Sequence, residues 1–70
     1  MLKILEIKEI TKNVFIITEN TGVEDLHNPK ADSGEEELID CKVGSRLYLE
    51  QIDIIRYFYP EIEIKINFAT

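Results

Sequence analysis

A segment near the C-terminal end carries the clearest hydrophobic pattern of the chain. From residue 61 to residue 68, polar and apolar residues alternate without a break. This period of two is typical of a strand with one buried face. We therefore predict a half-buried strand over residues 61–68. Its apolar positions, expected on the inner face, are Ile62, Ile64, Ile66 and Phe68.

The first twenty residues indicate two further strands. Residues 2–10 follow a period of two that Ile4 and Ile10 break, so we expect a strand with a bulge. The run VFIIT at 14–18 is short and rich in β-branched and aromatic residues, which favour strands. A polar break at 11–13 separates the two segments. They are predicted to form an antiparallel hairpin whose second strand is more buried than the first.

Residues 20–37 differ from both flanks. They contain Gly22, Pro29 and Gly34, few apolar residues and no visible period. Glycine and proline interrupt regular structure, and the absence of periodicity is typical of loops. We therefore predict a long loop, which leads into a third strand at 38–43.

Residues 44–59 allow two interpretations. In one, Gly44 and Ser45 form a two-residue turn into another strand at 46–50. In the other, Ser45 caps a helix that runs to about Tyr59 and ends before Pro60. Apolar residues recur here at spacings of three and four, which favours the helix. The residues on this predicted face are Tyr48, Ile52, Ile55 and Tyr59.

The predicted order is β-β-loop-β-α-β within a single domain spanning residues 1–70. This order indicates an α+β fold in which one helix covers a small, mostly antiparallel sheet of about four strands. A small all-β barrel is the alternative. In the predicted third strand, Ile39, Cys41 and Val43 share one face.

Composition narrows the class of protein. Apolar residues make up 44% of the 70 residues, which is too many for a chain disordered throughout. No apolar run approaches the roughly 18 residues that span a bilayer, and charges interrupt the first residues where a signal peptide is apolar. A single cysteine fits a reducing compartment. We expect a cytoplasmic protein without a membrane segment.

Charge is distributed unevenly along the chain. Eight basic residues stand against fourteen acidic ones, for a net charge of −6. Residues 19–40 hold eight of the acidic residues and only Lys30, so this segment carries −7 and the remainder +1. The acidity therefore belongs to the predicted loop and its flanks, which argues against a nucleic-acid binder that uses its whole surface.

The chain has few of the histidine, cysteine and glycine residues that commonly form catalytic, metal or phosphate sites. His27 is the only histidine, and no ligand spacing surrounds it. Cys41 alternates with apolar neighbours, which predicts a buried and unreactive thiol. The three glycines are scattered, so no phosphate-binding loop is indicated. We expect no enzymatic activity, no cofactor and no metal.

These features predict a small non-catalytic protein-binding module, an accessory subunit or an inhibitor. Its partner is expected to be a basic protein, bound through the acidic 20–37 loop and an edge strand. Tyr57, on the predicted helix, is expected to give the same partner an aromatic contact. The predicted partner-binding residues are Glu24, Asp25, Asp32, Glu35, Glu36, Glu37 and Tyr57.

Two further interactions follow from the pattern. A local basic face around Lys42, Arg46 and Arg56 is the basis of an alternative function, nucleic-acid binding. Independently of either function, the 61–68 strand is expected to support a homodimer if it lies at a sheet edge. Two antiparallel copies would set Glu63 against Lys65.

Overall fold

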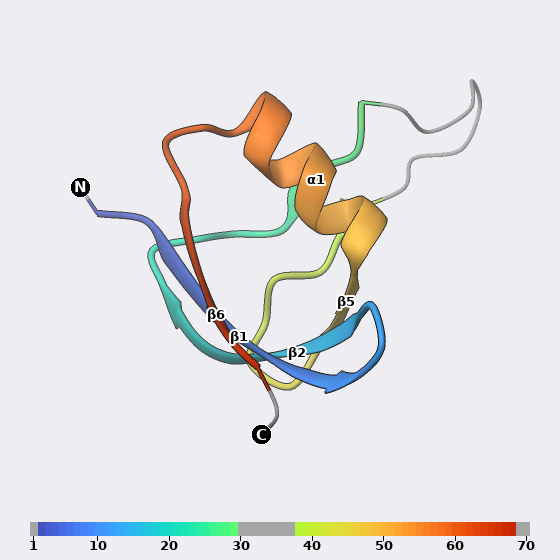
Figure 1. Cartoon of the computed structure of the whole chain (residues 1–70). Coiled ribbons are helices and arrows are strands. Elements are labelled where there is room, and N and C mark those ends of the chain that lie inside the picture. The colour runs from blue at the N-terminus through green and yellow to red at the C-terminus, as the bar shows by residue number, and fades with distance from the viewer. Residues whose placement is uncertain (1, 30–37, 69–70) are drawn as a thin grey trace.

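The computed structural model describes residues 2–29 and 38–68, which form two sheets and one helix (Figure 1). The main sheet is mixed and has the strand order β5-β2-β1-β6. Its strands are β1 (Ile4–Thr11), β2 (Val14–Thr21), β5 (Arg46–Tyr48) and β6 (Glu63–Asn67). A second, two-stranded sheet pairs β3 (Leu26–His27) with β4 (Leu38–Ile39). The helix is α1 (Leu49–Phe58).

This arrangement confirms the predicted α+β fold. The β1–β2 and β2–β5 pairs are antiparallel, and only β1 and β6 run parallel. Parallel strands cannot be joined by a tight turn and need a longer crossover connection. The chain between β1 and β6 provides it, and α1 forms part of this connection, between β5 and β6. The barrel alternative is wrong, because in the described part of the chain β5 and β6 remain the two open edges of the main sheet.

The N-terminal hairpin has the predicted position and the predicted irregularity. The register between β1 and β2 shifts at Glu6/Ile7 and again between Glu9 and Thr11. Asn13, with φ of 64°, supplies the left-handed residue of the connecting turn. The expected difference in burial between the strands is wrong. Each strand buries two side chains, because both lie inside the sheet with a neighbour on either side.

The two interpretations of residues 44–59 each describe part of the structure. Arg46–Tyr48 forms β5 against β2, and the helix begins only at Leu49. Ser45 does not cap the helix, because its backbone is held by β2: the Ile17 N–H donates to the Ser45 carbonyl at 2.9 Å. The N-cap is Tyr48. At the other end, the Tyr59 N–H donates to the Ile55 carbonyl at 2.8 Å, one residue before Pro60.

The predicted 38–43 strand is shorter in the structure, where only Leu38–Ile39 is extended and paired. The chain then turns through residues 42–45, closed by a hydrogen bond from the Ser45 N–H to the Lys42 carbonyl at 3.0 Å. Gly44, with φ of 95°, permits this turn. Val43 is consequently 61% exposed, and it does not share the buried face of Ile39 and Cys41.

The predicted 20–37 loop contains more regular structure than expected. β2 continues to Thr21, and β3 lies at 26–27, where it pairs with β4. Residues 30–37 lie outside the described part of the chain.

Figure 1 shows α1 over one face of the main sheet, and the core side chains lie between the two. Its fully buried side chains are Leu5, Ile7, Ile17, Ile39, Cys41, Leu47, Ile52 and Ile55. In the described part of the chain, no helix or further strand covers the opposite face of the sheet. Among the described residues, α1 is the only helix, and with ten residues it is too short to cross a membrane.

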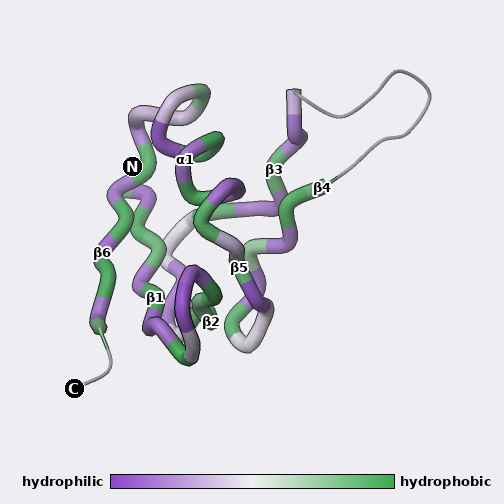
Figure 2. Tube along the Cα trace, turned by 45° about the vertical axis from the view of Figure 1, so that its right-hand side comes forward, coloured by the Kyte–Doolittle hydropathy of each residue, from purple (hydrophilic) through white to green (hydrophobic). Residues whose placement is uncertain are grey.

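Polar and apolar residues alternate along β6 as predicted, and Figure 2 shows this alternation. The strand is shorter than predicted, at Glu63–Asn67, and Phe68 lies beyond it with 64% of its surface exposed. Ile62 is buried, whereas Ile64 and Ile66 are half-buried. Their partial exposure follows from position, because among the described strands β6 has a neighbour on one side only.

Candidate functional site

The outer surface of α1 carries an open groove of about 700 Å³. Its lining residues are Leu49, Glu50, Asp53, Ile54, Tyr57 and Phe58. They fall at spacings of three, four and five along the helix, which brings them to one side. The opposite side of α1 is anchored in the core by Ile52 and Ile55. The groove is therefore built on a rigid element that burial holds in place.

The groove exposes apolar and aromatic surface. Tyr57 is 74% exposed, Phe58 42% and Leu49 39%. The rings of Tyr57 and Phe58 meet edge to face, with centroids 4.8 Å apart and planes at 80°. This geometry is a favourable one for aromatic pairs, so each ring helps to hold the orientation of the other. Ordered aromatic surface loses little side-chain entropy when it contacts a partner.

Two carboxylates accompany the aromatic pair. Glu50 lies in the first turn of α1, and Asp53 follows one turn later. Within residues 2–29 and 38–68, neither forms an ion pair; the one ion pair there joins Glu63 and Lys65. Arg46 does not lie on this helix face, because it belongs to β5. The groove thus combines apolar surface with negative charge that no described cation neutralises.

The predicted acidic residues lie elsewhere. Glu24 and Asp25 are exposed and line a second hollow, on the side of Lys3 and Ile62, which shares no residue with the α1 groove. Asp25 also has a structural contact, since its Oδ1 accepts the backbone N–H of Cys41 at 3.2 Å. The other four predicted contacts lie outside the described residues: Asp32, Glu35, Glu36 and Glu37.

Asn20 has a structural role that the sequence pattern did not single out. Its Nδ2 donates to the carbonyls of Val23 and Cys41, at 2.7 and 2.6 Å, and its Oδ1 accepts the Val23 N–H at 2.9 Å. One side chain thereby joins the end of β2 to the segment after β4. An asparagine two residues before Gly22 is a common sign of a side-chain-stabilised turn, and this signal was available in the sequence.

The basic residues of the alternative function are not gathered into one surface. Leu47 points into the core under α1, so its neighbour Arg46 points to the open face of the sheet. Arg56 lies in the last turn of α1, on the other side of the core. Lys42 occupies the turn before β5, where its N–H donates to Asp40 Oδ1 at 3.0 Å. This hydrogen bond is the main cause that lowers the pKa of Asp40.

The histidine and the cysteine are not brought together as a reactive pair. His27 is exposed, and its backbone carbonyl accepts the Tyr59 hydroxyl at 2.8 Å. Cys41 is 1% exposed, and burial, assisted by the negative charge of Asp25, raises the pKa of its thiol to about 11. In the described part of the chain, no three metal-ligating side chains cluster as an ion would require.

Comparison with family models, curated proteins and solved structures finds no match to this chain. The site is therefore interpreted from its own geometry.

Proposed function

We propose that this chain is a small non-catalytic protein-binding module that holds a basic segment of a partner protein in the α1 groove. The observation that carries this proposal is the pairing of exposed Tyr57 and Phe58 with two carboxylates that lack an ion-pair partner in the described structure. The function is the one expected from the sequence, with the contact surface centred on the helix.

The chemistry of the groove defines the segment it would hold. An aliphatic or aromatic side chain of the partner would cover the apolar surface of Leu49, Tyr57 and Phe58. A lysine or arginine beside it would pair with Glu50 or Asp53 and lie against the tyrosine ring. Aromatic residues dominate the energy of many interfaces, so Tyr57 is expected to contribute most.

The surrounding charge would assist the encounter. The whole chain carries −6, and residues 19–40 carry most of it. A negative field of this kind attracts a basic partner and raises the association rate, more strongly at low salt. The predicted acidic loop would contribute its charge to this field. A reducing compartment such as the cytoplasm fits the single buried thiol.

The test is selection of binding peptides from a random displayed library, followed by titration of the selected peptides. We expect the selected sequences to place Lys or Arg next to an apolar residue. Tyr57→Ala should weaken their binding about tenfold or more, the size of an interface hot spot. The double variant Glu50→Gln, Asp53→Asn should remove much of the salt dependence.

The matched control is Glu24→Gln, which removes an exposed acidic charge outside the groove. It should leave peptide affinity within about twofold of the parent, because distant exposed charges are screened. Selected peptides that bind Tyr57→Ala as tightly as the parent protein would refute the groove as the binding site.

A further inference from the structure

The strand β6 forms an open edge of the main sheet, and its backbone orientation can be assigned. The Glu63 N–H donates to the Lys3 carbonyl at 2.9 Å, so the backbone groups of Glu63 face β1. Backbone groups of successive strand residues point to alternate sides. Those of Ile64 and Ile66 therefore point away from the sheet. In the described structure no strand pairs with β6 on that side.

Side chains along this edge leave apolar surface uncovered. Ile64 and Ile66 pack against the core but remain half-buried. An added strand would bury the remainder of both side chains while it pairs their backbone groups. The other edge strand, β5, offers fewer backbone groups for pairing, because it has only three residues before α1 begins. Long unprotected edges are the usual sites at which sheets add strands.

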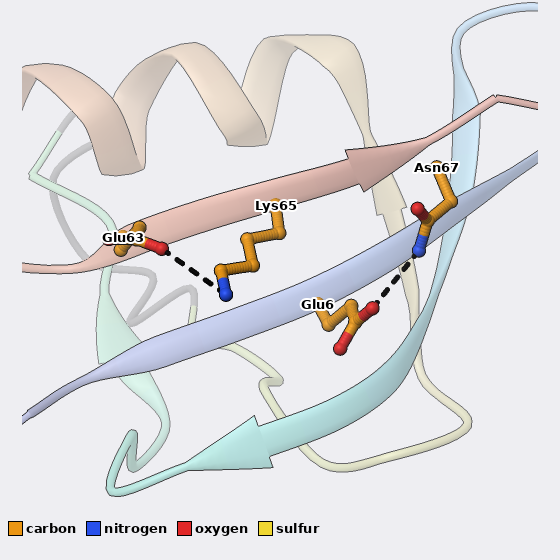
Figure 3. A network of polar contacts seen from close by, with 4 residues as sticks. All are labelled: Glu6, Glu63, Lys65 and Asn67. Carbon is orange, nitrogen blue, oxygen red and sulfur yellow. Dashed lines mark hydrogen bonds and ion pairs between the residues drawn. The ribbon is translucent and has the colours of Figure 1, made fainter.

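The open face of the sheet adds a charge pattern to the edge (Figure 3). Glu63 and Lys65 lie on β6 with their charged groups 3.7 Å apart, and both side chains are more than half exposed. Asn67, next on the same face, donates to Glu6 Oε1 at 3.2 Å and is thereby held to β1. The edge thus presents one negative and one positive charge, two residues apart.

We propose that β6 pairs antiparallel with β6 of a second copy of this chain, about a two-fold axis at Ile64. In this register Ile64 faces Ile64 of the other copy through paired backbone groups, and Glu63 of each copy faces Lys65 of the other. The main sheets join into one continuous sheet with both helices on the same face. A shift by one position along each strand places Lys65 against Lys65 instead, so charge selects the first register.

The test measures the dimer dissociation constant by sedimentation at about 0.15 M salt, where the net negative charge of the two copies is largely screened. The parent chain should dimerise in the micromolar range. Lys65→Glu and Glu63→Lys should each weaken the dimer about tenfold or more, because symmetry converts two attractive contacts into two repulsive ones. The double variant Glu63→Lys, Lys65→Glu should dimerise as the parent does.

Mixing the Lys65→Glu variant with the Glu63→Lys variant is the most decisive test of the register. A chain with two negative charges on β6 should pair with a chain that has two positive charges, although each alone is mainly monomeric. Thermal melts of both variants check that the fold is retained. Tyr57→Ala, which alters the α1 groove, is the matched control and should dimerise normally, so that failure of the groove and failure of the edge are distinguishable.

Hydrogen exchange locates the contact. The amides of Ile64 and Ile66 should become protected as concentration rises, whereas a dimer through another surface leaves them unchanged. Three results would each overturn the proposal: a parent chain that stays monomeric to about 1 mM, a dimer that is insensitive to the charge substitutions, or protection that is absent at these two amides.

Discussion

Asn20 shows how much a single polar side chain can organise in a domain of 70 residues. Its amide satisfies two carbonyls and one N–H that belong to different segments of the chain. Hydrogen bonds in partly buried positions stabilise more than exposed ones, because losing a partner leaves a polar group poorly solvated. Asn20 therefore fixes the path of residues 20–25 relative to Cys41.

We expect Asn20→Ala to lower the free energy of unfolding by about 2 kcal/mol, since three partner groups lose their contact. The measurement is urea unfolding monitored by circular dichroism. Asn67→Ala is the matched control, because Asn67 makes one exposed hydrogen bond of 3.2 Å. The control should change stability by less than about 0.5 kcal/mol. Equal effects of the two substitutions would contradict the structural role of Asn20.

Cys41 makes stability depend on pH at the alkaline end. Its pKa rises from 9.0 to about 11 on folding, so the folded state favours the protonated thiol. This contribution is fully present below pH 9 and is lost as the pH rises toward 11. Between pH 8.5 and 10.5 the loss is roughly 1.5 kcal/mol. Cys41→Ala removes this contribution, so comparing the two pH profiles isolates it from tyrosine and lysine titration.

At the scale of elements, the junction between β5 and α1 explains why the pattern of residues 44–59 was ambiguous. The strand Arg46–Tyr48 and the helix Leu49–Phe58 follow each other without a loop. A three-residue strand is too short to show a period of its own, so the helical spacing extends across it. The junction is held from outside, because the Leu49 N–H donates to the Asn13 carbonyl in the hairpin turn at 3.1 Å.

The start of α1 also depends on Gln51. Its Oε1 accepts the Tyr48 N–H at 2.9 Å, which satisfies a backbone donor at the helix N-terminus. We expect Gln51→Ala to cost about 0.5–1 kcal/mol in thermal or urea unfolding. Gln51→Glu keeps the acceptor and adds a negative charge near the positive end of the helix, so it should be neutral or stabilising. A destabilisation as large as that of alanine would argue against this cap.

The hydrophobic pattern predicted several elements correctly, although the alternation over residues 38–43 predicted a strand that the structure limits to Leu38–Ile39. The hairpin strands, the helix and β6 appear where hydrophobic spacing placed them. Features that depend on partners distant in sequence were out of reach, such as the turn that exposes Val43 and the parallel pairing of β1 with β6. The candidate site, too, was predictable only in part. Tyr57 was identified from its helical position, whereas its grouping with Leu49 and Phe58 required the structure.

At the scale of the whole molecule, the two proposed surfaces are separate. The α1 groove covers one side of the core, and the β6 edge lies at the end of the sheet. In the proposed dimer both helices lie on the same face of a continuous sheet, so the two grooves face the same way. A partner with two basic segments would then bind both copies, and its apparent affinity would exceed that of either segment alone.

The parallel pairing of β1 with β6 has a consequence for the rate of folding. Ile4 lies beside Glu63, so nearly the whole chain separates two neighbouring strands of one sheet. The hairpin of β1 and β2 closes a turn of few residues, whereas the docking of β6 must close a loop of almost sixty. Folding speed falls as such distant contacts accumulate. The hairpin is thus expected to form early, and β1 acquires its second neighbour in the last and slowest step of sheet assembly.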